Sequence, residues 1–214
     1  AADSHRSEAA ENSQQESQRD TRGNASVRVY TNTGNDLNVD AKGDGGNKRS
    51  ENTGGQAVTG GITAANGINI NVKQDAVYQG ISLDAGTGKA QVTAENGNIR
   101  FDQATDRSHE SHNDFNVKVS AKGGSTPETK NVGGGLGGGR SVGESDSSNA
   151  QVSSIGGQQG VELEAGRGLT LQGSNGTSQG DITLKAGDKV AVQAAKSHQT
   201  RKDDTLSGNI DIGG

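Results

Sequence analysis

The sequence contains no cysteine, methionine or tryptophan, and it has a single proline, two tyrosines and two phenylalanines. Without cysteine there is no disulfide framework, no thiolate zinc site and no thiol nucleophile. No run of about 18 apolar residues predicts a membrane-spanning helix, and no charged segment leads into an apolar run as in a signal peptide. The formal net charge of −5 argues against a protein that binds nucleic acid by neutralising phosphates.

Large apolar side chains are also scarce. Valine, isoleucine, leucine and phenylalanine together supply 34 of the 214 residues, fewer than the 35 glycines. So small an apolar content cannot build a thick globular core that offsets the entropy lost when the chain is ordered. Two possibilities remain: a disordered chain, or a fold with a thin core that needs only one or two inward aliphatic side chains per strand.

The aliphatic residues are not scattered, because they alternate with polar residues in short runs. Ile81–Ala85, Val161–Ala165 and Ile182–Ala186 each place an apolar residue at every second position. A period of two is typical of a half-buried β-strand, and no stretch of useful length has the i, i+3, i+4, i+7 spacing of a helix. The predicted inward side chains are Ile81, Leu83, Val92, Ile99, Phe101, Val161, Leu163, Leu169, Leu171, Ile182, Leu184, Val190 and Val192.

The chain also repeats itself. Gly80–Gly88 (GISLDAGTG) matches Gly160–Gly168 (GVELEAGRG), and glycines follow both strands, where tight corners need a positive φ. Three Ser-His pairs, ending at His5, His109 and His198, each precede a charged, hydroxyl-rich run. These matches predict one solenoid segment over residues 1–214 that holds about two repeats of roughly 90–100 residues.

Polar stretches separate the strand clusters, at residues 1–25, 43–58, 102–115, 122–158 and 194–207. They are predicted to be extended excursions, loops or polar strands, from an ordered solenoid. The stretch 122–158 is rich in glycine and serine, and its composition leaves open whether it joins the solenoid or is disordered.

The strand-and-corner unit at Gly180–Gln199 (GDITLKAGDKVAVQAAKSHQ) resembles the haemagglutinin repeats of filamentous-haemagglutinin-type exoproteins. Gly160–Ser174 is similar to the coil that precedes this unit in such arrays. The resemblance covers most of the chain and is best at 59–121 and 160–214. The family includes large two-partner-secretion adhesins and contact-dependent growth inhibition effectors of Gram-negative bacteria.

This resemblance implies an all-β protein, a right-handed parallel β-helix with polar loop excursions, secreted through an outer-membrane partner to the cell surface of a Gram-negative bacterium. It implies a non-enzymatic structural or adhesive rod, with a role in virulence, that contacts a host or bacterial cell-surface receptor or glycan, or presents and delivers a distal domain. One alternative is the toxin-delivery segment of a contact-dependent growth inhibition effector. A second is a β-helix enzyme that acts on polysaccharides.

Three polar motifs were considered as binding sites, and none is predicted to be one. Gly134–Ser141 has nearly the spacing of a phosphate-binding loop but lacks the flanking strand and helix, so it is expected to be a flexible loop. His109 and His112, with Asp106, Glu110 and Asp114 nearby, face opposite sides of any strand and do not form a closed metal site. Asp40–Asn47 only loosely matches an oxygen-rich calcium loop.

The acidic residues Asp84, Glu162 and Glu164 are the candidates for the enzyme alternative. Cleavage of a glycoside requires a pair of carboxyl groups with separated pKa values. These three residues instead alternate with inward aliphatic residues, as on any solvated strand face. The sequence therefore predicts no catalytic, cofactor-binding or metal-binding residues, and no bound cofactor or nucleic acid.

Overall fold

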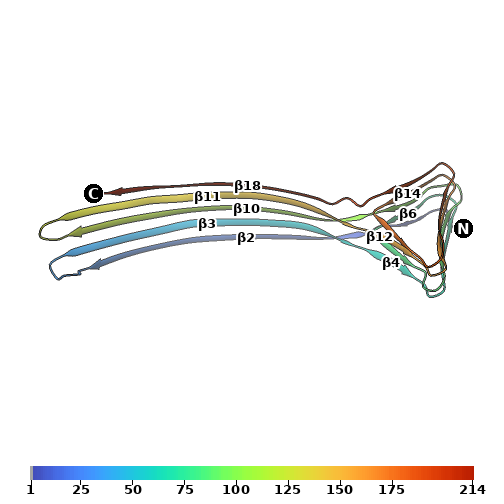
Figure 1. Ribbon diagram of the computed structural model, residues 1–214, viewed down its shortest axis with the longest axis horizontal. Coiled ribbons are helices and arrows are strands. Elements are labelled where there is room, and N and C mark those ends of the chain that lie inside the picture. Colours follow the sequence, from blue (N-terminus) through green and yellow to red (C-terminus); the bar gives the residue numbers. More distant parts are fainter. Residues whose placement is uncertain (1) are drawn as a thin grey trace. The chain divides into compact units, whose positions relative to one another are not determined.

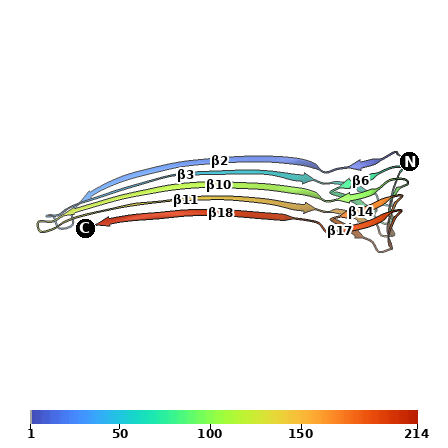
Figure 2. The same ribbon diagram turned by 90° about the horizontal axis from the view of Figure 1, so that it is seen from above.

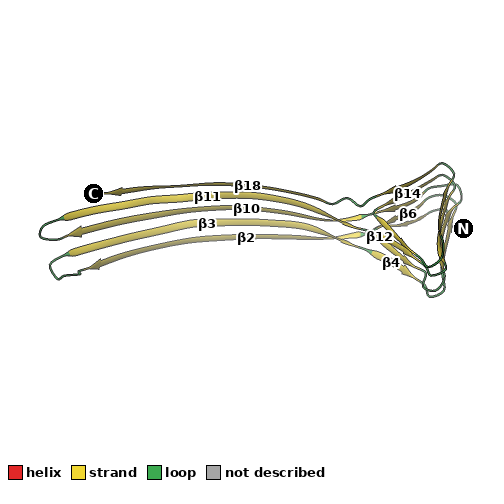
Figure 3. Ribbon diagram, viewed as in Figure 1, coloured by secondary structure: helices red, strands yellow, loops and turns green. Residues whose placement is uncertain are grey.

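The computed structural model describes residues 2–214, and within them the regular structure consists of β-strands and contains no helix (Figure 3). The described residues therefore offer no apolar helix of membrane-spanning length. The chain divides into two compact units, each built from three separate stretches of sequence. Unit 1 comprises Ala1–Gln14, Gly54–Ser108 and Ser147–Gln199, and unit 2 comprises Gln15–Thr53, His109–Asp146 and Thr200–Gly214.

Unit 1 contains three parallel β-sheets. The first is β1 (His5–Ser7), β6 (Ala76–Gln79), β9 (Ile99–Asp102), β14 (Gly168–Gln172) and β17 (Lys189–Gln193). The second is β15 (Ser174–Thr177), β12 (Ser153–Gly156), β7 (Ile81–Asp84) and β4 (Gly60–Thr63). The third is β16 (Ile182–Ala186), β13 (Gly160–Ala165), β8 (Lys89–Ala94) and β5 (Ile68–Val72).

Each coil of the chain adds one strand to each of the three sheets, so that β4–β5–β6, β7–β8–β9, β12–β13–β14 and β15–β16–β17 form successive coils. Equivalent residues of neighbouring coils stack in register, as in the pairs Leu163–Val92 and Leu163–Leu184. This architecture is a parallel β-helix, so the predicted fold class is confirmed. It explains how a chain with few apolar residues can fold, because each strand needs only one or two inward side chains.

The predicted inward stack is largely correct. Eight of its members are at most 3% exposed, namely Ile81, Leu83, Val92, Ile99, Phe101, Val161, Leu163 and Leu169. Leu171 and Leu184 are partly buried against this core. Three further members lie on the last coil and are not buried, since Ile182, Val190 and Val192 are 47%, 42% and 68% exposed. They occupy inward positions, but the described residues place no further coil over β16 and β17.

The core also contains residues that the pattern did not single out. Tyr78 is the largest fully buried side chain, and its inward position pairs with that of Phe101 on the next coil. Ile68, Val72 and Ile155 are buried as well. Ile68 and Val72 belong to the alternating strand β5 (ININV), which the predicted inward set did not include, whereas Ile155 follows two serines in β12.

Two kinds of connection alternate at one corner of the coils. After β6 and β14 the chain turns directly into the next coil through Gly80 and Gly173, which have φ values of 57° and 56°. After β1 and β9 it instead leaves into a pair of long strands before returning to β4 and β12. At Gly80 an added Cβ would lie 2.6 Å from the Cβ of Ala104, so this corner requires glycine for both its φ and its close packing.

Unit 2 contains most of a five-stranded sheet in the order β18-β11-β10-β3-β2. The strands are β2 (Ala10–Tyr30), β3 (Leu37–Val58), β10 (Ala104–Ser125), β11 (Lys130–Gln151) and β18 (His198–Gly213). Short loops at 31–36 and 126–129 join neighbouring strands, and the arrowheads alternate along the sheet, which makes it antiparallel (Figures 1 and 2). The polar excursions are thus strands rather than loops.

This arrangement also determines the structure of residues 122–158. The stretch consists of the end of β10, the turn, and all of β11 and β12. The tract Gly134–Ser141 lies inside β11, so its interpretation as a flexible loop is wrong. The neighbouring strand β10 approaches the glycines of β11 closely. A side chain at Gly138, for example, would meet Val117.

The sequence matches do not follow the structural register. Val161 of the second glycine-flanked strand pairs with Ala90, whereas Ile81 of the first lies in a different sheet. His5 belongs to β1, while His109 lies within β10. Equivalent positions of the coils are instead His5, Ile99 and Val190, which recur about every 90 residues because one period comprises two coils and one pair of long strands.

Both turns of unit 2 are closed by side chains or backbone within the loop. The Asp36 carboxylate accepts hydrogen bonds from the backbone N–H groups of Asn32 and Thr33 at 2.9 and 2.7 Å. These bonds favour the charged carboxylate and lower the pKa of Asp36 to about 2. In the other turn, the N–H of Thr126 donates to the carbonyl of Thr129 at 2.8 Å.

Candidate functional site

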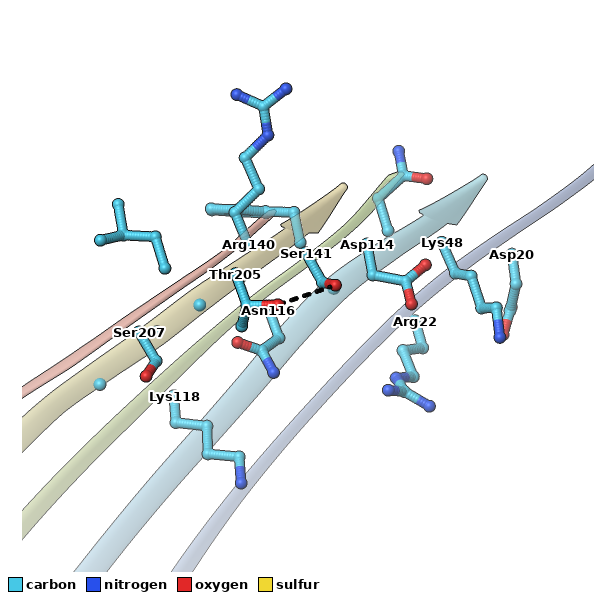
Figure 4. Close-up of a pocket in the computed structure, with 17 residues that line it drawn as sticks. Asp20, Arg22, Lys48, Asp114, Asn116, Lys118, Arg140, Ser141, Thr205 and Ser207 are labelled. Atoms are coloured by element: carbon cyan, nitrogen blue, oxygen red, sulfur yellow. Dashed lines mark hydrogen bonds between the residues drawn. The ribbon is translucent and has the colours of Figure 1, made fainter. Parts of the chain in front are cut away.

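The face of the unit 2 sheet that carries the even-numbered residues of β10 holds a shallow groove of about 550 Å³. Its lining includes Gly137 and Gly139, whose missing side chains leave the backbone of β11 uncovered on this face. Asn116, Lys118 and Ser141 lie around it (Figure 4). The Ser141 hydroxyl lies 3.4 Å from that of Thr205 on β18.

The groove carries charges of both signs. Arg22, Lys48 and Lys118 supply cations, and Asp20 and Asp114 supply carboxylates. In Figure 4 the Arg140 side chain projects to the opposite side from Asn116 and Lys118. A mixed-charge groove with a glycine floor suits a polar, extended ligand such as a peptide or glycan chain rather than a compact anion.

A second cluster joins β10 to β11 through His109, Glu144 and Asp146. Their ligand atoms all lie within 4.8 Å of one another, and His109 Nδ1 is 2.7 Å from Asp146 Oδ1. Hydrogen bonding to Asp146, with smaller contributions from the charges of Glu144 and Glu51, raises the pKa of His109. The half-buried imidazole and the two exposed carboxylates can contact a divalent cation, although a closed structural zinc site uses four ligands.

The sequence identified one member of this cluster and missed two. Glu144 and Asp146 are far from His109 in sequence, and only the pairing of β10 with β11 brings them together. His112 lies on the other face of the sheet, where its ring occupies the space that a side chain at Gly143 would need. Asp106 belongs to unit 1, where its carboxylate accepts the backbone N–H of Ala57 at 2.7 Å.

The remaining predicted motifs lie in strands. Gly134–Ser141 lines the groove from within β11 and has no following helix that could form a phosphate-binding loop. Asp40–Asn47 lies within β3, where an extended backbone points successive side chains to opposite faces. That geometry does not gather the oxygen ligands that a calcium loop directs to one point.

The three acids considered for glycoside cleavage are divided between two sheets. Asp84 ends β7, and its Oδ1 accepts the N–H of Gly86 at 2.9 Å, which closes the corner. Glu162 and Glu164 are on β13 in another sheet. An ion pair with Lys89 lowers the pKa of Glu162, which is the opposite of the rise that a general acid needs.

The structure therefore defines a class of protein, a repeat-built β-solenoid whose coils are joined alternately by plain corners and by pairs of long strands. The profile of the Hemagglutinin repeat family matches residues 1–114, 92–177 and 168–214. The chain belongs to this family, which confirms the predicted haemagglutinin-repeat segment of a two-partner-secretion exoprotein.

Two curated relatives extend this result. A protein named Hemolysin from Serratia marcescens is 65% identical over 212 residues, and a protein named Hemolysin from Proteus mirabilis is 38% identical over 212 residues. Each alignment covers 99% of this chain and 13% of the relative. The chain thus spans about one eighth of the length of these relatives. No solved structure matches it significantly.

Proposed function

We propose that the chain is a non-catalytic structural segment of a secreted Gram-negative exoprotein, in which a stiff β-helix alternates along the sequence with pairs of long strands. The observation that supports this most directly is the regular alternation of coils and paired long strands, with Gly80 and Gly173 at equivalent plain corners. Each structural period has the same architecture, and its stability comes from contacts with the neighbouring coils.

The acidic side chains favour a structural role over catalysis. Asp84 closes a corner, and Glu162 is held as a carboxylate by Lys89. The polysaccharide-active alternative requires a carboxyl group that stays protonated near neutral pH beside an ionised partner. Neither Asp84 nor Glu162 is placed for that task, so we favour the rod over the enzyme.

For the whole exoprotein, we propose export through an outer-membrane secretion partner and a hemolysin-type activity, because both curated relatives are named Hemolysin. Within it, this segment presents distal parts at the cell surface and supplies an adhesive surface. The mixed-charge groove beside Ser141 and Thr205 supports adhesion, since it offers hydrogen-bonding groups to a receptor or glycan. The names favour this reading over a growth-inhibition effector.

The rod function is tested by deleting one structural period from the full exoprotein. Removing residues 99–189 joins Asn98 to Val190, and Val190 is stacked at the position of Ile99, so the register is kept. We expect the shortened protein to be secreted at an unchanged level. A deletion of 99–150 breaks the coil register and should abolish secretion or make the product protease-sensitive.

A catalytic role would give a different result. If Glu162→Gln or Asp84→Asn abolished the activity of the exoprotein while its secretion and circular dichroism stayed normal, the non-catalytic proposal would be wrong. Adhesion is tested separately by sedimentation of the purified chain with erythrocytes. An absence of binding there contradicts the adhesive role but leaves the rod function standing.

A further inference from the structure

The two faces of the unit 2 sheet differ in polarity. Ten large hydrophobic side chains of this unit are between 50% and 75% exposed, namely Val27, Val29, Leu37, Phe115, Val119, Val132, Leu136, Leu206, Ile210 and Ile212. Side chains alternate between the faces of a strand, so the strand register decides whether these ten gather on one face or are divided between both.

Contacts at the glycines establish the register across β10, β11 and β18. A Cβ on Gly135 would meet the side chains of Ser120 and Asp211, which therefore share one face. A Cβ on Gly138 would meet Val117, which shares the other. Alternation along each strand from these anchors puts every exposed hydrophobic residue of β10, β11 and β18 on the same face as Val117. These residues are Phe115, Val119, Val132, Leu136, Leu206, Ile210 and Ile212.

The same reasoning extends to β3 and β2. Gly124 lies against the side chains of Asn38 and Asn131, so Asn38 is on the polar face and Leu37 is on the opposite one. A Cβ on Gly55 of β3 would meet the side chain of Glu11 of β2, so these two residues share a face, and alternation along the two strands places Leu37, Val27 and Val29 on it. All ten exposed hydrophobic residues thus share one face, which we call the apolar face.

The apolar face is continuous and free of charge over its central part. Between Phe115 and Gly123, every second residue of β10 on this face is apolar or glycine. The same is true of Gly23–Val29 in β2 and of Leu206–Ile212 in β18. Strand spacings give it dimensions of about 20 by 27 Å, hence about 500 Å². That area is at the upper end of apolar patches on monomers, where such patches usually mark an interaction site.

Basic side chains border the apolar face at both ends. By the same alternation, Arg140, Arg49 and Arg19 lie on it at one end, and Lys130 lies on it at the other. Figure 4 shows the Arg140 side chain on the opposite side of the strands from Lys118. Carboxylates of this face, such as Glu51, begin beyond the arginines. An apolar surface with cations at its margins matches the acyl chains and phosphates of a lipid bilayer.

We propose that the apolar face of unit 2 docks on the surface of a lipid bilayer, with its aliphatic side chains in the acyl region and its basic residues at the phosphates. This goes beyond the proposed structural role and does not depend on it. A second copy of the chain fits less well. If two such faces packed in parallel, Arg140 of one copy would meet Arg140 of the other. If they packed antiparallel, Arg140 would meet Lys130, so either arrangement brings like charges together.

Tryptophan reporters test the proposal, because the natural chain contains no tryptophan. Val119→Trp places a reporter on the apolar face, and Ser120→Trp places one on the polar face of the same strand. The whole 214-residue chain is mixed with vesicles of phosphatidylcholine and phosphatidylglycerol. We expect the emission of the Val119→Trp protein to move to shorter wavelength and that of the Ser120→Trp protein to stay constant.

Each outcome decides the proposal. No shift for Val119→Trp, or equal shifts for both reporters, overturns it. A short-wavelength emission without vesicles that grows with protein concentration also overturns it, because a second copy then covers the face. Phe115→Trp, an aromatic replacement at an exposed position of the same face, serves if Val119→Trp does not fold.

The basic border has its own test with matched controls. Replacing Arg19, Arg49 and Arg140 by glutamine should weaken vesicle binding about 100-fold, since each cation near an anionic surface contributes several-fold to affinity. Replacing Arg22, Lys48 and Lys118 of the polar face by glutamine removes the same charge and should weaken binding much less. Equal losses from the two triple variants would mean that net charge alone drives binding, which contradicts docking through the apolar face.

Discussion

Tyr78 stacks on Phe101 with a ring centroid distance of 4.6 Å and an interplanar angle of 23°. The two residues occupy the same inward position of consecutive coils, in the register Ser7–Tyr78–Phe101–Leu171–Val192. The Tyr78 hydroxyl is buried without a hydrogen-bond partner, and burial raises the pKa of Tyr78 to about 12. The largest residues of the thin core are thus concentrated in one column.

The hydroxyl of Tyr78 makes a testable contribution to stability. Tyr78→Phe should raise the free energy of unfolding by about 1 kcal/mol, because it removes a buried polar group that has no partner. Phe101→Ala should lower it by about 3–5 kcal/mol, because it leaves a cavity under the Tyr78 ring. Urea unfolding followed by circular dichroism measures both. A loss of stability in Tyr78→Phe would show that the hydroxyl has a partner.

Position along the stack should decide the cost of a truncation. Leu163 is fully buried between Val92 and Leu184, so Leu163→Ala should cost about 2–4 kcal/mol. Val192 has an inward position but is 68% exposed, so Val192→Ala should cost less than about 1 kcal/mol. Leu184→Asp should destabilise the last two coils by placing a charge beside Leu163. Equal costs for Leu163→Ala and Val192→Ala in thermal unfolding would contradict the stacking order.

The plain corners should not tolerate a side chain. Gly80→Ala combines a φ of 57° with a contact to Ala104, so it should lower the free energy of unfolding by more than about 1 kcal/mol. Gly123→Ala is the matched control, since Gly123 has neither a positive φ nor a neighbour within 4 Å. We expect a neutral or slightly stabilising effect there. Melting temperatures of the two variants test this contrast, and similar values would refute it.

The His109–Asp146 pair predicts a pH dependence with a defined sign. The pKa of His109 is raised in the folded state, so its stabilisation is complete below the unfolded value of about 6.5 and is lost as the pH rises through the folded pKa. Because both groups are exposed, the effect on stability is small. NMR titration should show a lower pKa for His109 in Asp146→Asn. An unchanged value would mean that the hydrogen bond is absent in solution.

The turn between β2 and β3 predicts the opposite sign. Asp36 has a folded pKa of about 2, so its contribution is present above its unfolded value of about 4 and is lost as the pH falls through 2. Asp36→Ala removes the acceptor of the Asn32 and Thr33 N–H groups and should increase their hydrogen exchange. Asn38, whose amide donates to Asp36 at 2.6 Å, provides a milder Asn38→Ala control.

The sequence was sufficient to predict the coils but not the excursions. Alternation at Ile81–Ala85 or Val161–Ala165 has only one physical explanation, a strand with one buried face. The long strands of unit 2 bury little on either face, so Gly134–Ser141 carries no core signal and its composition predicts a loop. Their extended structure follows from pairing with neighbours far away in sequence, and this pairing has no local signature.

The candidate sites divide in the same way. That His109 and His112 face opposite sides follows from the period of a strand, and the structure agrees. The partners Glu144 and Asp146 lie on another strand, and only the hairpin register brings them to His109. The apolar face has the same origin, since Val119 and Ile210 look like isolated hydrophobic residues until the sheet aligns them.

By itself the sequence determined the class of protein, because period-two alternation, glycine corners and the haemagglutinin-repeat resemblance are local features. The tertiary structure alone decided which residues are neighbours between coils and across the long strands. Tyr78 is buried because coils stack on both sides of it, whereas Val192 is exposed at an equivalent inward position because the described residues place no coil over β17. The reason is that parallel coils and antiparallel hairpins obtain their contacts from residues tens of positions apart, where no short pattern specifies the register.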